Sequence, residues 1–206
     1  MTTGHKPTAY RAPAIAVLVL FLMSLCWVGA AAAASSAGWG LEELMQRLAQ
    51  VKSAKGKFVE RRYLRILTEP LELTGTLTYT APGYLEKHTL TPRPESMVLD
   101  QDRLTIEDKA RRRRTLALQD YPVLWAFVES IRSTLAGDLQ SLNRFYRVDL
   151  EGDEREWRLL LKPREGRMQT MVNEIRIGGS GQLVRIIEVL EAGGDRSVMT
   201  ITEDKR

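Results

Sequence analysis

The side chains that most often act as nucleophiles, bases or metal ligands are scarce in this chain of 206 residues. It contains two histidines, His5 and His88, and a single cysteine, Cys26. No Ser-His-Asp arrangement or G-x-S-x-G motif is evident, and a zinc site of the common types lacks ligands. We therefore interpret His88 as an ordinary strand residue and expect no metal, no cofactor and no enzymatic activity.

Carboxylates are plentiful, but their positions favour local roles. Asp100 and Asp102 lie in a stretch whose composition is typical of a hairpin turn. Other acids sit beside cations in the sequence, as Glu60 does beside Arg61. A hydrolase remains an alternative, and it would need activity on a lipid ester that survives replacement of the strand histidine.

Four consecutive arginines, Arg111, Arg112, Arg113 and Arg114, form the sharpest charge feature. One interpretation is a solvated strand end or turn, because charge runs usually face water. The other is a contact patch for anionic headgroups or for an acidic protein partner. The sequence leaves both open.

Large apolar side chains occur at spacings that place them on inner faces of strands and of one helix. They predict either a filled core or a cavity for acyl chains, and periodicity does not separate the two because both need the same pattern. The candidate lining residues are Phe58, Leu77, Tyr79, Leu85, Met97, Leu104, Trp125, Phe127, Ile131, Trp157, Leu159, Ile175 and Ile187.

The strongest strand signal lies in residues 71–82 (LELTGTLTYTAP). From Leu73 to Thr80 the residues alternate strictly, which predicts an antiparallel strand with one apolar and one polar face. Similar patterns predict further strands at 58–66, 84–90, 97–99, 104–106, 111–118, 145–150, 156–162, 171–177, 183–190 and 197–202. Helical spacing predicts helices at 40–53 and 122–135, with a short third helix at 138–142.

This order of elements predicts the fold class. Two runs of five or six strands, each linked by short turns, favour one antiparallel sheet rather than a parallel one. Two or three helices are too few to cover both faces, and a sheet this wide must curl. We expect a mainly β protein with some α, in which a single curled antiparallel sheet forms an incomplete barrel lidded by helices.

The N-terminal residues are typical of a secretory signal. Lys6 and Arg11 precede an apolar run over residues 14–28, and small residues follow at 30–34. We expect cleavage after Ala34, which leaves a domain spanning 35–206 without cysteine, although an uncleaved anchor is an alternative. The formal net charge is +4 for the whole chain. Without the two signal cations the remainder is nearly balanced, which argues against a nucleic-acid partner.

Several segments, in order, resemble the periplasmic lipoprotein-carrier family, the LolA-like proteins. They are 54–60 (AKGKFVE), 75–82 (GTLTYTAP), 100–104 (DQDRL) and the late hairpin 174–188. The resemblance implies an incomplete barrel with a hydrophobic hollow for acyl chains. It also implies a monomer in the periplasm that receives lipoprotein from an inner-membrane exporter and delivers it to an outer-membrane acceptor.

One position departs from the family pattern. The family carries an arginine just before the proline that ends this strand, where it helps to latch the lid, but here Ala81 precedes Pro82. The resemblance therefore implies a latch that is absent or rebuilt, with the helix carrying Trp125 and Phe127 as the lid. A sensing or interaction module on the same scaffold, which binds lipoprotein or a protein partner without transport, is the alternative function.

Overall fold

The computed structural model describes residues 38–164 and 166–203. The expected signal peptide and its cleavage site lie outside these residues. The described strands are β1 (Ser53–Tyr63), β2 (Leu71–Thr80), β3 (Tyr84–Thr91), β4 (Glu95–Asp100), β5 (Arg103–Asp108), β6 (Arg113–Ala117), β7 (Tyr146–Gly152), β8 (Trp157–Pro163), β9 (Val172–Ser180), β10 (Leu183–Glu191) and β11 (Arg196–Glu203). The described helices are α2 (Leu41–Leu48), η1 (Leu118–Asp120), α3 (Pro122–Ala136), α4 (Leu139–Phe145) and α5 (Gly166–Gln169).

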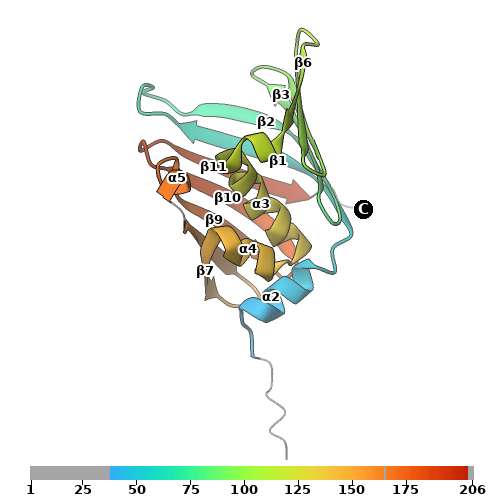
Figure 1. Cartoon of the computed structure of the whole chain (residues 1–206), viewed down its shortest axis with the longest axis vertical. Helices are drawn as coiled ribbons and strands as arrows, with labels where there is room; N and C mark the ends of the chain where they lie inside the picture. Colours follow the sequence, from blue (N-terminus) through green and yellow to red (C-terminus); the bar gives the residue numbers. More distant parts are fainter. Residues whose placement is uncertain (1–37, 165, 204–206) are drawn as a thin grey trace, which may run out of the picture. The chain divides into compact units, whose positions relative to one another are not determined.

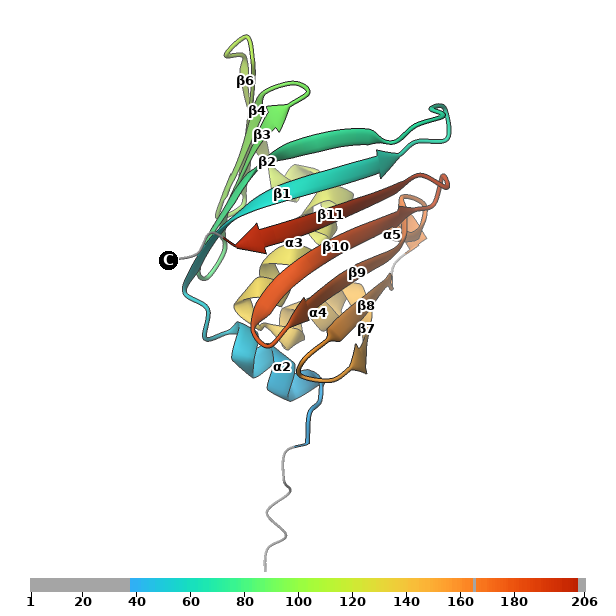
Figure 2. The ribbon, with the colours of Figure 1, turned by 180° about the vertical axis from the view of Figure 1, so that it is seen from behind.

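All eleven strands form one sheet in the order β6-β5-β4-β3-β2-β1-β11-β10-β9-β8-β7. Every neighbouring pair is antiparallel. The strands β6 and β7 remain as free edges, so the sheet does not close. Figures 1 and 2 show that the sheet curls and that α2, α3 and α4 lie on its inner face. The predicted fold class is confirmed.

The predicted elements agree with the structure except at their boundaries. The first helix ends at Leu48 rather than near Ser53, because β1 already begins at Ser53 and pairs with β2 from there. The main helix is the predicted one, and Gly137 ends it with a left-handed φ of 68°. The one-turn helix α5 was not predicted, since four residues are too few to show a helical period.

A dense core fills only one half of the inner face. Side chains from α2, α4, β7, β8 and β9 meet there, and Leu44, Leu142, Tyr146, Leu159 and Ile175 have no exposed surface. The core holds the helices against the β7–β10 half of the sheet. Within residues 38–164 and 166–203, no helix is both long enough and apolar enough to cross a bilayer.

Candidate functional site

A cavity of about 1100 Å³ lies between α3 and the other half of the sheet. Its wall consists mainly of apolar side chains from the inner faces of the strands and from one face of α3. From the strands these are Leu77, Tyr79, Leu85, Met97, Leu99, Leu104, Ile106, Ile187, Met199 and Ile201, and from α3 they are Val123, Leu124, Phe127, Val128, Ile131 and Leu135. A cavity of this size lies slightly above the usual range for small-molecule sites, which is about 300–1,000 Å³.

The helix α3 forms the roof because its two faces carry different residues. Small or polar side chains such as Ala126, Ser130 and Ser133 are buried on the face toward the other helices, where Tyr146 Oη donates a hydrogen bond of 3.0 Å to the Ala126 carbonyl. The large apolar residues Phe127 and Ile131 face the cavity and remain half-buried. The helix lies close to α2, α4, α5 and η1 and approaches no strand as closely, which leaves the space beneath it empty.

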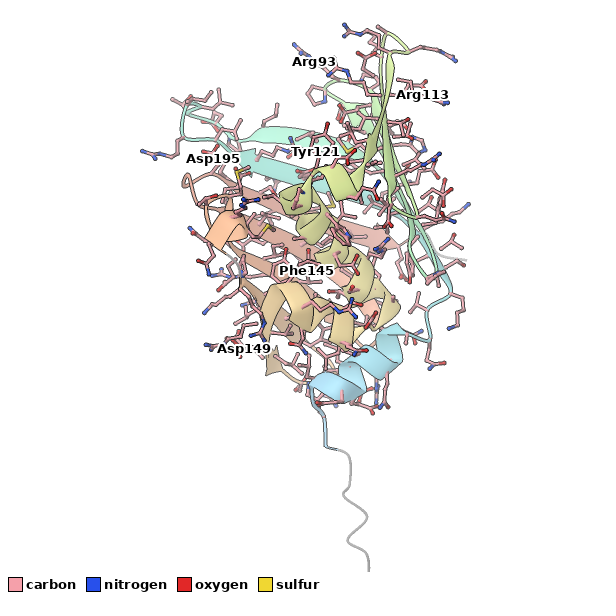
Figure 3. All side chains as sticks on the ribbon, in the orientation of Figure 1. Arg93, Arg113, Tyr121, Phe145, Asp149 and Asp195 are labelled. Atoms are coloured by element: carbon pink, nitrogen blue, oxygen red, sulfur yellow. The ribbon has the colours of Figure 1, made fainter. Side chains whose placement is uncertain are left out.

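The cavity reaches the surface at one end of the sheet. Tyr121, at the start of α3, and Met171, before β9, are exposed lining residues there. Figure 3 places Tyr121 and Asp195, which lies on the β10–β11 hairpin, at this end. An apolar chain could therefore enter lengthwise beneath α3.

The structure brings together eight of the thirteen predicted site residues. The eight residues that line the cavity are Leu77, Tyr79, Leu85, Met97, Leu104, Phe127, Ile131 and Ile187. The alternation predicted for β2 explains Leu77 and Tyr79, because both lie on the inner face that packs toward α3.

The structure places the other five predicted residues elsewhere. Trp157, Leu159 and Ile175 are fully or almost fully buried in the dense core, because the helices pack directly on β8 and β9. Phe58 is buried on the inner face of β1 but does not line the cavity. Trp125 points away from the cavity and lies against Phe145 of α4, with ring centroids 5.9 Å apart, so it is not positioned to gate the cavity.

A charged bridge, formed by Glu60, Arg62 and Lys87, interrupts the apolar wall. Glu60 accepts hydrogen bonds from Arg62 Nε at 2.7 Å and from Lys87 Nζ at 2.5 Å. The bridge crosses β2 at Gly75, where any Cβ would lie 1.9 Å from the His88 carbonyl oxygen. Lys87 Nζ passes 4.9 Å from the centre of the Phe58 ring on its way to Glu60.

Glu60 forms no ion pair with Arg61, its neighbour in the sequence. Adjacent strand residues point to opposite faces, so Arg61 is on the outer face and pairs with Glu72 at 3.0 Å. The period-two alternation from Phe58 through Glu60 to Arg62 was the signal that could have identified the bridge. The cross-strand position of Lys87 needed the tertiary structure.

Glu60 is held in its charged form. Burial alone would raise the pKa of this carboxyl, but the hydrogen bond from Arg62 and the charge of Lys87 outweigh burial and lower the pKa below its usual range. The charged bridge therefore places two cations and one anion in contact within a wall of mainly apolar side chains.

Arg132 on α3 ties the roof to the sheet. Its Nη1 donates to the Gln101 carbonyl at 3.0 Å and lies 3.3 Å from Asp102 Oδ1, both in the β4–β5 hairpin. Its Nε also donates to the buried Glu129 at 3.0 Å, and its Cδ occupies the space that a Cβ on Gly83 would need. Arg132 therefore supplies, from the lid helix, a charged group that ties α3 to the hairpins. On the strand, Ala81 has no charged group that could form such a tie.

The arginine run lies at the tip of the β5–β6 hairpin, and all four residues are exposed. Arg112 pairs with Asp108, and Arg113 pairs with Glu107, so half of the run is locally neutralised. Figure 3 shows Arg113 at the same end of the sheet as Arg93.

His88 is on the outer face of β3, 2.5 Å from Glu86. Among residues 38–164 and 166–203, no cluster of three His, Cys, Asp or Glu side chains could hold a metal ion.

The sequence matches the family model described as "Outer membrane lipoprotein carrier protein LolA-like" over residues 30–202. The chain belongs to this LolA-like family. The match includes both the strands of the cavity wall and the helix that roofs it, and it confirms the resemblance seen in the sequence. The sequence matches no curated protein.

Solved structures similar to this LolA-like chain have low sequence identity to it. A LolA superfamily protein from Nitrosomonas europaea has a TM-score of 0.44 and 8% identity, with 79% of this chain and 91% of that chain covered. The MucA/MucB complex of Pseudomonas aeruginosa gives 0.45 and 16%, covering 80% and 57%. A DUF1329 family protein from Desulfovibrio piger gives 0.43 and 12%, covering 79% and 90%.

Proposed function

We propose that this LolA-like protein is a periplasmic carrier, residues 35–206 after removal of a signal peptide at 1–34. It binds the acyl chains of lipoproteins, or of another lipidated cargo, and moves them from an inner-membrane exporter to an outer-membrane acceptor. The single observation that carries the proposal is the apolar cavity of about 1100 Å³ beneath α3. Membership in the LolA-like family supports it.

The size of the cavity fits this cargo. A methylene group occupies about the volume of one water molecule, about 30 Å³, so 1100 Å³ holds about thirty to forty methylenes. This corresponds to about two long acyl chains. Each methylene removed from water contributes about 0.8 kcal/mol, and contacts of this kind have no fixed direction. A carrier can therefore hold a chain firmly and still release it to a more apolar acceptor.

Binding of a series of alkyl chains tests this proposal. We expect the affinity to rise about fourfold for each added methylene, which is about 0.8 kcal/mol, until the chain fills the cavity. Native mass spectrometry of protein purified from the cell envelope should show a bound lipid. Protein that carries no lipid and shows no dependence of affinity on chain length contradicts the proposal.

A cavity-blocking variant supplies the matched test. Met97 of β4 points into the cavity, while its neighbour Val98 is on the outer face of the same strand. Met97→Trp should reduce chain binding by at least about tenfold by occupying the space that the chain needs. Val98→Trp, which adds the same side chain outside the cavity, should leave binding within about twofold. Equal effects would point to a general loss of stability rather than to the cavity.

An interaction module that senses envelope state is the second candidate, and the exposed run Arg111–Arg114 favours it. Arg111 adopts a positive φ of 60° at the hairpin turn, and Arg113 and Arg114 follow as the first residues of β6. We expect replacement of the four arginines by glutamate to abolish capture of an acidic partner while chain binding persists. Loss of chain binding alone, with capture intact, would contradict a role for the run in partner contact.

A further inference from the structure

The charged bridge has more donors than its single carboxylate can accept. Lys87 carries three N–H donors and Arg62 carries five. Within the described residues, each cation donates one side-chain hydrogen bond, and both go to Glu60. The side chains of Lys87 and Arg62 are 19% and 39% exposed and line the cavity, so their remaining donors are accessible from inside it.

The other charged lining residues do not neutralise this surplus. Glu86 is on the outer face of β3, where its carboxylate is 2.5 Å from His88. Glu203 pairs in register with Gly56, four residues along β1 from Glu60, which is about 13 Å away. Asp195 accepts a hydrogen bond from the backbone of Arg65 at 2.9 Å. Asp120 and Glu191 also line the cavity, but among the described residues Glu60 is the only carboxylate that forms an ion pair with Lys87 or Arg62.

A second group lining the cavity also lacks a partner. The hydroxyl of Tyr79 is buried and makes no hydrogen bond to any described residue, and the side chain lines the cavity. Tyr79 is diagonal to Lys87 across β2 and β3, because Leu77 is the residue directly opposite Lys87. A buried hydroxyl without a hydrogen-bond partner is unfavourable, and an oxygen acceptor on a ligand would supply the missing hydrogen bond.

We propose that the cavity selects amphiphiles whose head group is an anion, a carboxylate or a phosphate, which binds Lys87 and Arg62 while the alkyl chain lies beneath α3. This inference rests on the proposed carrier function, and it narrows the cargo from any acylated molecule to acidic lipids. Within the bridge, the carboxylate of Glu60 pairs with both cations and balances one of their two positive charges. A bound anion would balance the other half.

Three ligands of equal chain length test the selection: hexadecanoate, hexadecyl phosphate and hexadecanol. Each is measured below its micelle concentration or, for the alcohol, below its solubility limit, by displacement of the uncharged probe N-phenyl-1-naphthylamine. We expect both anions to bind at least about tenfold more tightly than the alcohol, as a hydrogen-bonded charge pair requires. A preference between the two anions distinguishes a fatty acid from a phosphate-bearing lipid as the source of the head group.

Variants of the bridge give opposite effects. Lys87→Met keeps an unbranched apolar side chain but removes the ammonium group, and it should reduce the preference for anions to about threefold or less while the alcohol binds as before. Arg62→Met is the second variant should Lys87→Met fail to fold. Glu60→Gln removes the competing carboxylate and should increase the preference. Arg61→Met, on the outer face of β1, should change nothing.

The outcomes separate the two proposals. Equal binding of the alcohol and both anions overturns the selection for acidic lipids and leaves the carrier function intact. A preference that persists in both Lys87→Met and Arg62→Met also overturns it. Failure of all three ligands to bind contradicts the carrier function itself.

Discussion

Replacement of Glu60 by glutamine tests the buried bridge most directly. The Glu60 side chain is 6% exposed, and glutamine keeps its size but removes its charge. Removal of one partner from a fully buried ion pair costs about 3–5 kcal/mol, because the remaining charge is left without compensation. Arg62 and Lys87 are partly exposed and can turn toward solvent, so we expect a loss of about 2–3 kcal/mol. This corresponds to a fall in Tm of about 5–10 °C.

The loss should depend on pH in a defined direction. The pKa of Glu60 in the folded protein lies below its value in the unfolded chain, which is about 4.3. The ionised carboxylate therefore contributes its full stability above the unfolded pKa, and this contribution disappears as the pH falls through the folded pKa. The difference between wild type and Glu60→Gln should be larger at neutral pH than at a second pH well below the unfolded pKa of about 4.3.

Urea unfolding followed by tryptophan fluorescence measures the effect at both pH values. Glu72→Gln is the matched control, because Glu72 accepts a hydrogen bond from Arg61 at 3.0 Å and both side chains are about half exposed. An exposed pair contributes about 0–1 kcal/mol, so the control should change stability by less than about 1 kcal/mol. If the two variants lose equal stability, or if the Glu60 effect is the same at both pH values, the reasoning about a buried ionised bridge is refuted.

Three further predictions concern the roof. Arg132→Gln removes the tether to the β4–β5 hairpin, so it should lower stability by about 1–2 kcal/mol and speed amide exchange in α3. Arg144→Gln, on the exposed side of α4, is the control and should change neither stability nor amide exchange. Gly137→Ala should lower the free energy of unfolding by at least about 2 kcal/mol in the same urea assay. The reason is that φ at this position is 68° and the added Cβ would lie 2.1 Å from the Met45 carbonyl oxygen. An unchanged free energy of unfolding would contradict this geometry. Phe127→Ala should weaken chain binding by about tenfold through lost apolar contact. Trp125→Ala, on the side of α3 away from the cavity, should leave chain binding within about twofold of wild type. Equal losses of binding would indicate that Trp125 does gate the cavity.

The sequence by itself determined the elements and their order. The residues that alternate from Leu73 to Thr80 lie in turn on the inner and the outer face of β2, as the pattern predicted. Gly137 ends α3, also as predicted. Short turn-rich links between the strand segments required antiparallel pairing. These features follow from local backbone geometry, which neighbouring residues specify on their own.

Only the tertiary structure decided which apolar residues line a cavity and which fill a core. Leu77 and Leu159 follow the same strand pattern, yet α3 stands off β2 while the helices pack directly on β8. The pairing of Glu60 with Lys87 was also beyond the sequence, because 27 positions separate the two residues and β2 lies between their strands. Alternation fixes the face on which a side chain lies, but the distance to the opposing layer depends on contacts between elements far apart in the chain.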